Sequence, residues 1–330
     1  MAIACLEQKL PQDERRKALN AIKSGKLKAS ARDVCIEEAD SPRAGEFGRG
    51  TPRSIAKSRG MALFTVSSKD GTLISSQCYG AGRPLVIISG ALFASELWLK
   101  VMPLLSSQRC AVVLDRRGRG KSGNGSSYAP ERELEDILAV ITGLGGSVDL
   151  LGHSSGAILA LQVAQAAPAQ LERLVVYEPP VFFAAEDRIA SDLPERLEAL
   201  LAAGQAEAAV ETFLREGPRV SEAELRGMKA GSAWPQMVSG LAHTVPYDSR
   251  VQRGFSADPP SLARVRIPTR MLLGSASPPR MRSAAETLVA RLPNATVSEL
   301  AGQQHVAMLT APALFANAVN EFLASQPASS

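Results

Sequence analysis

The sequence predicts an α/β fold: a mostly parallel, eight-stranded sheet with helices on both faces and a helical lid inserted between its sixth and seventh strands. Three observations predict it. Short apolar runs of strand length recur, helix patterns separate most of them, and one long stretch has no strand signal. Parallel strands covered on both faces read as continuous apolar runs and need crossover helices. Contents of 45% hydrophobic and 21% charged residues exclude collagen-like, coiled-coil and wholly disordered chains.

The first two predicted strands, Leu63–Ser67 and Thr72–Tyr79, form a hairpin around the turn Lys69–Gly71. A hairpin at this point fits an antiparallel second strand in an otherwise parallel sheet. The other six strands are predicted from apolar runs, which are Leu85–Ser89, Cys110–Asp115, Val148–Gly152, Leu174–Glu178, Thr269–Gly274 and Thr296–Leu300.

Helix patterns lie between these runs, and more helices fill the long stretch without strand signals. The five sheet helices are predicted at Ser95–Leu105, Pro130–Gly143, Ser155–Ala167, Pro279–Leu292 and Ala311–Ala324. The stretch over residues 181–262 contains two amphipathic helix patterns that part near Gly204. Because a structureless loop of about eighty residues is unusual, we expect a helical lid at 181–262 and a core of 61–180 and 263–330.

The net charge of +4 is unevenly distributed. Residues 1–60 carry 13 Lys and Arg against 8 Asp and Glu, whereas the remaining residues carry 24 against 25. We therefore expect a flexible basic extension at 1–60, with anchoring through it as the functional alternative. The body gives no reason to expect nucleic-acid binding, and no apolar run reaches the ~20 residues of a membrane helix. The oligomeric state stays open.

The four cysteines are Cys5, Cys35, Cys78 and Cys110, and none forms a CxxC pair. This spacing argues against a zinc site and against a disulfide framework, so we expect reduced thiols and no metal. The N-terminus lacks an apolar core of signal-peptide length. Together these features predict a cytoplasmic protein.

The strongest chemical signal is Gly152-His153-Ser154-Ser155-Gly156, which follows an apolar strand and precedes a helix. A GxSxG sequence between strand and helix forms a sharp turn that presents the central serine. Its glycines let strand and helix approach, and the next backbone N–H faces a developing oxyanion.

Four motifs together resemble the α/β-hydrolase superfamily over about residues 62–325. They are SGALF (89–93), DRRGRGKSG (115–123), GHSSG (152–156) and GQQHVAM (302–308). DRRGRGKSG and YEPP (177–180) more narrowly resemble an AB hydrolase-1-like branch of poorly characterised bacterial hydrolases. The resemblance implies the α/β-hydrolase fold with an inserted lid, a serine nucleophile at Ser154 and no cofactor.

Three histidines are candidates for the base that a serine nucleophile needs. The resemblance places the base at His305, after the last strand; the alternative is an ordinary loop histidine. His153 is expected to be structural and to point away from the nucleophile. His243, in the lid, is expected to pack there or to face the substrate.

The acid departs from the usual family pattern, because the turn after the seventh strand, Gly274–Pro279, holds no carboxylate. Some family members carry the acid at the end of the sixth strand, where this chain has Glu178. We expect Glu178 to orient His305; the alternative is a glutamate that bonds loop backbone at the lid hinge. Asp115 is a rival candidate for the acid, but we expect it to hold the arginines and backbone of its own loop together.

The expected oxyanion donors are the backbone N–H groups of Ser155 and Ala91, although the chain has Ser-Gly-Ala where many relatives have His-Gly. Apolar residues are expected to bind the substrate, with packing of the lid's own core as the alternative. They are Phe93, Phe182, Phe183, Trp234 and Met237.

These residues predict a serine hydrolase that cleaves a small-to-medium apolar carboxylic ester, or a related acyl substrate, through an acyl-enzyme on Ser154. A serine at the elbow disfavours dehalogenase and epoxide hydrolase chemistry, for which family members use aspartate. Two alternatives stay open, because fold does not fix function. They are a non-catalytic binding protein with this fold and a serine-dependent lyase or cyclase.

Overall fold

A computed structural model of the chain describes residues 62–107, 109–181, 183, 189–255 and 258–325. The predicted extension at 1–60, the first two cysteines and Phe182 lie outside these described residues, so the structure does not test them.

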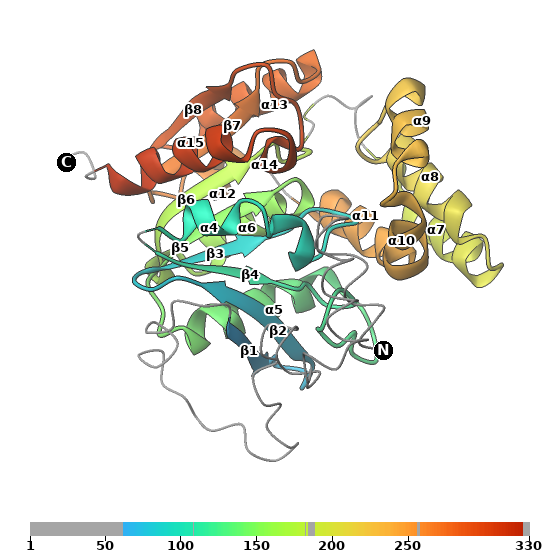
Figure 1. Ribbon diagram of the computed structural model, residues 1–330, viewed down its shortest axis with the longest axis horizontal. Coiled ribbons are helices and arrows are strands. Elements are labelled where there is room, and N and C mark those ends of the chain that lie inside the picture. Colours follow the sequence, from blue (N-terminus) through green and yellow to red (C-terminus); the bar gives the residue numbers. More distant parts are fainter. Residues whose placement is uncertain (1–61, 108, 182, 184–188, 256–257, 326–330) are drawn as a thin grey trace, which may run out of the picture. The chain divides into compact units, whose positions relative to one another are not determined.

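A single eight-stranded sheet holds the described strands in the order β1-β2-β4-β3-β5-β6-β7-β8 (Figure 1). Strand β2 pairs antiparallel with both β1 and β4, and every other pairing is parallel. This confirms the predicted strand number and the antiparallel second strand. The strands are β1 (Ala62–Ser67), β2 (Leu73–Tyr79), β3 (Pro84–Ile88), β4 (Cys110–Leu114), β5 (Val148–His153), β6 (Leu171–Tyr177), β7 (Thr269–Gly274) and β8 (Ala295–Leu300).

Helices cover both faces of the sheet, and each face has its own apolar cluster. Three helices pack mainly on one face: α5 (Pro130–Gly143), α6 (Ser155–Ala166) and α13 (Pro279–Arg291). The other face carries the 3-10 helix η1 (Ser95–Trp98) with α4 (Met102–Leu105), α14 (Ala307–Thr310) and α15 (Pro312–Ala324). A short 3-10 helix, η2 (Pro168–Gln170), leads into β6.

One predicted helix is wrong in its continuity. The pattern at Ser95–Leu105 predicts one helix, whereas the structure has η1 and α4 with a break between Trp98 and Met102. Pro103 has no N–H to donate to the carbonyl of Leu99, so a continuous α-helix would lose a hydrogen bond there. The predicted helix at Pro130–Gly143 is confirmed residue for residue.

The described secondary-structure elements between β6 and β7 are all helices, and we call this part of the chain the helical insert. It has an apolar cluster of its own, to which Leu92 of the loop after β3 also belongs. Gly204, at φ 71°, separates its first two helices, as predicted. No helix in the described ranges is long and apolar enough to cross a membrane. The insert comprises α7 (Leu193–Ala202), α8 (Ala206–Glu216), α9 (Glu222–Ala230), α10 (Trp234–Leu241), η4 (Ala242–Thr244), α11 (Val245–Gly254) and α12 (Pro259–Leu262).

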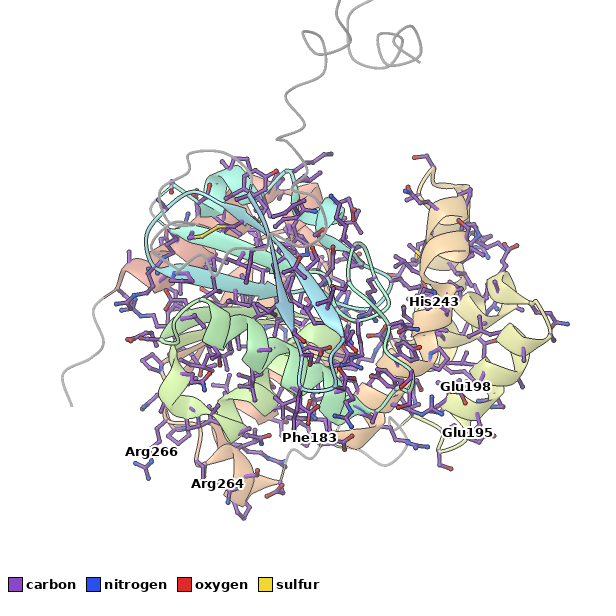
Figure 2. All side chains as sticks on the ribbon, turned by 90° about the horizontal axis from the view of Figure 1, so that it is seen from below. Phe183, Glu195, Glu198, His243, Arg264 and Arg266 are labelled. Atoms are coloured by element: carbon purple, nitrogen blue, oxygen red, sulfur yellow. A yellow bond between two sulfur atoms is a disulfide. The ribbon has the colours of Figure 1, made fainter. Side chains whose placement is uncertain are left out.

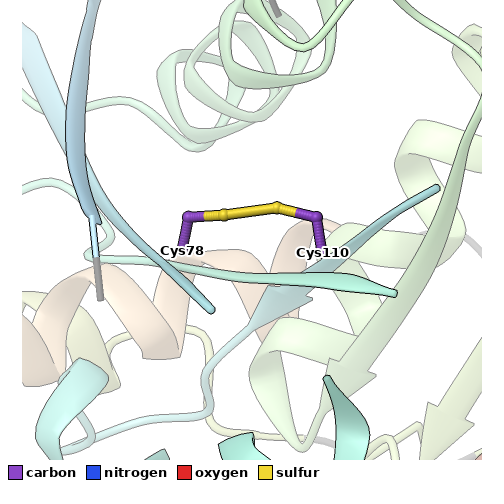
Figure 3. The surroundings of a disulfide bond; sticks show 2 residues. All are labelled: Cys78 and Cys110. Atoms are coloured by element: carbon purple, nitrogen blue, oxygen red, sulfur yellow. A yellow bond between two sulfur atoms is a disulfide. The ribbon is translucent and has the colours of Figure 1, made fainter. Parts of the chain in front are cut away.

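The prediction of reduced thiols is wrong for one pair of cysteines. A disulfide joins Cys78 on β2 to Cys110 on β4, with the two Cα atoms 6.3 Å apart (Figure 3). The two strands are sheet neighbours, so the register brings these residues within bonding reach although 32 positions separate them. Sequence spacing does not reveal such a cross-strand pair, and the cysteines no longer support a cytoplasmic location.

Candidate active site

Ser154 lies between β5 and α6 in a backbone conformation that non-glycine residues rarely adopt, with φ 55° and ψ −125°. Two glycines make this turn possible. A Cβ at Gly152 would lie 2.5 Å from Ala157 Cα, and one at Gly156 would lie 2.4 Å from the Ile88 carbonyl oxygen. The GHSSG segment therefore forms the sharp strand-to-helix turn that its sequence predicts, with Ser154 at the carboxyl edge of the sheet.

Glu178 follows β6 at the same edge of the sheet, and its buried carboxylate joins two other segments. Its Oε2 accepts a hydrogen bond from His305 Nδ1 at 2.8 Å. Its Oε1 accepts one from the backbone N–H of Gly274 at 2.8 Å and another from the hydroxyl of Ser277. Glu178 is only 2% exposed and has φ 47°, a second strained backbone in this region.

These donors decide the charge of the buried carboxyl group. Burial alone raises the pKa of Glu178, but hydrogen bonds from His305, Ser277 and Gly274 outweigh it, and the net pKa is lowered. Glu178 is therefore ionised at neutral pH. A carboxylate bonded to Nδ1 fixes the imidazole so that Nε2 is its free nitrogen.

Two buried side chains hold the loop that carries His305. His153 Nε2 donates to the His305 carbonyl oxygen at 2.9 Å, and the two rings lie 4.8 Å apart. The Tyr177 hydroxyl donates to the Gln304 carbonyl and accepts from the Ala307 N–H at 3.1 Å. Burial lowers the pKa of His153 well below its ordinary value, so this ring stays neutral. The structural part predicted for His153 agrees with these contacts.

Glu178 is hydrogen-bonded to His305, but no hydrogen bond joins His305 to Ser154. Within the described residues, the ring of His305 has Glu178 as its side-chain partner. His305 nevertheless packs against His153, the residue before Ser154. Hydrogen bonds between a base and its nucleophile are often long without substrate and shorten in the complex.

The loop after β3 passes directly against Ser154. A Cβ at Gly90 would lie 2.8 Å from Ser154 Cβ, so only glycine fits there. Leu92, two residues on, has φ 57°. Ser155 begins α6, where backbone N–H groups have no acceptor within the helix. The structure therefore brings Ser155 and the segment containing Ala91 to the same serine.

Asp115 and the arginines of its loop are placed differently from the prediction. Asp115 accepts from the backbone N–H of Ser95 at 2.9 Å and of Lys121 at 3.0 Å, so it holds backbone as predicted. The expectation that it also holds the arginines is wrong, because they bond carboxylates elsewhere. The side chains of these arginines are buried.

The hydrogen-bond partner of the Ser155 hydroxyl is not among the residues predicted from the sequence. Asp248, on α11 of the helical insert, accepts from the Ser155 hydroxyl at 2.8 Å and from Arg116 Nη1 at 2.7 Å. Arg116 in turn bonds both oxygens of Glu133, at 2.6 and 2.7 Å. Asp248 lies in a helix with no recognisable motif around it, so its position beside Ser155 could not be predicted from local sequence patterns.

The apolar residues predicted to bind substrate are dispersed. Trp234 is buried in the apolar cluster of the insert and donates from Nε1 to Glu207 at 3.1 Å, and Met237 packs against that cluster. Phe93 lies near the site, with its ring 5.3 Å from that of His153. Phe183 instead packs against the cluster of α6 and α13, where Arg291 stacks on its ring at 4.2 Å. For Trp234 and Met237 these contacts favour the alternative of packing within the insert.

His243 joins the helical insert to the loop after β4. It is exposed, and its Nε2 donates to the Gly118 carbonyl oxygen at 2.8 Å. Figure 2 shows the labelled side chains of His243 and Phe183 well apart from each other. The structure therefore does not bring these two residues together in one pocket.

Comparisons with known proteins agree with this fold. An α/β hydrolase from Sphaerobacter thermophilus is similar in structure, with a TM-score of 0.73 and 36% identity over 79% of this chain and 100% of that chain. N-formylmaleamate deformylase of Pseudomonas putida is 37% identical over 105 residues, which are 31% of this chain and 39% of that protein. (E)-2-((N-methylformamido)methylene)succinate hydrolase of Acinetobacter baylyi is 24% identical over 75% of this chain and 93% of that protein.

A family model for the alpha/beta hydrolase family matches residues 85–318, which is more than half of the chain. The chain therefore belongs to the alpha/beta hydrolase family.

Proposed function

We propose that this hydrolase cleaves an acyl substrate through an acyl-enzyme on Ser154, with His305 as base and Glu178 as the orienting acid. The observation that carries the proposal is the hydrogen bond from His305 Nδ1 to the buried carboxylate of Glu178, beside a serine on a strained strand-to-helix turn. A serine hydroxyl is a poor nucleophile unless a base takes its proton, and an oriented imidazole supplies that base.

In the first half-reaction Ser154 Oγ forms a bond to the substrate carbonyl carbon, and its proton passes to His305 Nε2. The carbonyl oxygen becomes an oxyanion, which the N–H groups of Ser155 and Ala91 stabilise. Ionised Glu178 stabilises the imidazolium through Nδ1. The bond to the leaving group then breaks, and His305 returns the proton to that group.

In the second half-reaction water replaces the leaving group. His305 Nε2 takes a proton from the water as its oxygen bonds to the acyl carbon, and the same two N–H groups bind the new oxyanion. The bond to Ser154 Oγ breaks and the proton returns to that oxygen, which releases a carboxylic acid and restores the enzyme.

For the substrate we propose a small-to-medium apolar carboxylic ester or a related acyl compound, with the helical insert as a lid over the site. The apolar cluster of the insert includes Leu92 and packs against Ala91, so it reaches the loop of the proposed oxyanion hole. Among similar proteins are a deformylase and a formamido-compound hydrolase. N-formyl amides therefore belong beside esters among the substrates to be tested.

A fluorophosphonate probe tests the nucleophile, because it labels serines that an adjacent base activates. We expect it to label the wild type and to leave Ser154→Ala unlabelled, with circular dichroism showing both folded. Folded wild type that resists the probe and hydrolyses none of a panel of esters and N-formyl amides would instead favour a binding protein.

Product analysis in ¹⁸O-labelled water separates hydrolysis from lyase or cyclase chemistry. Hydrolysis places one solvent oxygen in the product acid, so we expect the label there for the best substrate of the panel. Esters of graded acyl length then measure the preference for apolar acyl groups. Turnover without the label in the product would refute the hydrolytic half of the proposal.

A further inference from the structure

We propose that Asp248 and Arg116 are positioning residues for the oxyanion hole, because they hold Ser155 and the loop after β3 in place. The inference rests on the proposed function, in which Ser155 and Ala91 donate their N–H groups. It adds two side chains whose hydrogen bonds go to the neighbours of the nucleophile.

The first part of the argument is the grip on Ser155. Asp248 Oδ1 accepts from the Ser155 hydroxyl at 2.8 Å and from Arg116 Nη1 at 2.7 Å, and that nitrogen also lies 3.0 Å from the Ser155 hydroxyl oxygen. These three groups form a closed triangle of hydrogen bonds. The side chain they hold belongs to the residue whose backbone N–H faces the oxyanion, so the triangle restrains the direction of that N–H.

The second part is the link to the other donor. Arg116 Nη1 also contacts the Ser89 carbonyl oxygen at 3.3 Å. Ser89 stands two residues before Ala91, in the loop that passes against Ser154 at Gly90. One guanidinium nitrogen therefore connects both backbone segments that carry the proposed donors.

Burial strengthens the hydrogen bonds between Arg116 and Asp248. The side chains of Arg116 and Asp248 are 1% and 0% exposed. The other edge of Arg116 bonds Glu133, and Arg119 Nη2 bonds Asp248 Oδ2 at 2.6 Å. Two arginines and two carboxylates balance in charge. All three nitrogens of Arg116 and both oxygens of Asp248 are hydrogen-bonded, whereas Arg119 Nε and Nη1 are buried without a partner among the described residues. Buried, charge-paired hydrogen bonds such as those between Arg116 and Asp248 resist rearrangement, and oxyanion stabilisation depends on donors that are already in position.

The same loop supplies a matched control. Arg117 pairs with Asp136 through two hydrogen bonds, at 2.8 and 2.7 Å, and these side chains are 0% and 2% exposed. The other hydrogen bonds of Arg117 go to Asp70 and to the Arg132 carbonyl, away from the elbow. A purely structural role for Asp248 predicts equal effects at Asp136 and Asp248.

The experiment compares Asp248→Asn with Asp136→Asn on the best substrate of the panel. For Asp248→Asn we expect kcat to fall roughly tenfold to a hundredfold with KM nearly unchanged, less than the loss of a whole oxyanion donor. Affinity for a phenylboronic acid, which forms a tetrahedral adduct with the serine, is expected to fall by a similar factor. For Asp136→Asn we expect a comparable loss of stability but a kcat within about twofold of wild type.

Ser155→Ala keeps the test decisive if Asp248→Asn folds poorly, because it removes only the hydroxyl and keeps the backbone N–H. We expect a kcat loss of about tenfold or less, and the double variant to be no slower than Asp248→Asn alone, since both changes break one link. Unchanged kcat in both single variants, or equal losses at Asp136 and Asp248, would overturn the proposal. Retained activity in Ser154→Ala would refute the proposed function instead.

Discussion

The ends of two neighbouring strands, β6 and β7, both contribute to the proposed catalytic acid, whereas many α/β hydrolases carry the acid after the seventh strand. The end of β6 carries the carboxylate of Glu178. The end of β7 carries donors, because the N–H of Gly274 and the hydroxyl of Ser277 both bond that carboxylate. The proposed acid is at one strand end, and the hydrogen bonds to its Oε1 come from the end of the other.

The comparison explains the turn at 274–279, which has no carboxylate. Ser277 cannot support an imidazolium charge itself, but its hydroxyl helps to keep Glu178 ionised, together with Gly274 and His305. Parallel neighbours end at the same edge of a sheet, so a carboxylate on either strand can approach the same histidine loop. The acid can therefore follow either strand. Where it follows β6, as we propose for Glu178, the turn after β7 supplies hydrogen-bond donors rather than the carboxylate.

The largest expected effect comes from removing the charge at the end of β6. Glu178→Gln keeps the shape but no longer stabilises an imidazolium, so we expect kcat/KM to fall roughly a thousandfold to ten-thousandfold. Steady-state kinetics on the best substrate measure it.

Glu172→Gln is the control for Glu178→Gln, since Glu172 lies near the other end of β6 and is exposed. We expect it to retain wild-type kinetics. Full activity in Glu178→Gln would remove Glu178 from the mechanism and leave it as a glutamate that bonds loop backbone.

Much of this arrangement could be predicted, because its signals are local. A hairpin pattern predicted the first two strands and apolar runs predicted the other six, and the central strands β4 and β5 are apolar because both of their faces are covered. The GHSSG sequence predicted the turn at Ser154, and the chain order together with the family resemblance singled out His305 and Glu178 as partners. The structure then placed these two in hydrogen-bond contact.

The contacts that the sequence did not reveal are those between distant segments. Asp248 reaches Ser155 from a helix 93 positions away, and Cys78 bonds Cys110 across a strand pairing. Neither is marked by spacing, because each depends on how elements pack. The role of Ser277 was missed for a related reason, since a hydroxyl becomes a donor to Glu178 only once β6 and β7 are adjacent.

A smaller effect is expected on stability, with a definite sign. The folded state lowers the pKa of Glu178 below its ordinary value of 4.5, so its contribution is full above that pH and disappears as the pH falls through the lowered pKa. We expect Glu178→Gln to lower the free energy of unfolding by about 2 kcal/mol at pH 7, and by progressively less below about pH 4.5. Urea unfolding of both proteins across this range measures it; a difference that widens on acidification would contradict the assignment.

The smallest effect tests the end of β7. Ser277→Ala removes one of the two hydrogen bonds to Glu178 Oε1 and leaves that of Gly274. We expect kcat to fall about threefold to tenfold, because only part of the roughly 1.5–3 kcal/mol of a hydrogen bond to a charged group is lost in the transition state relative to the ground state. Ser275→Ala is the matched control, because the Ser275 hydroxyl accepts from the Gly302 N–H in the same turn and should leave kcat unchanged. Equal kcat in wild type and Ser277→Ala would mean that the Ser277 hydroxyl does not contribute to catalysis through Glu178. A fall in kcat for Ser277→Ala but not for Ser275→Ala would instead show that the hydrogen bond from Ser277 contributes to the function of Glu178.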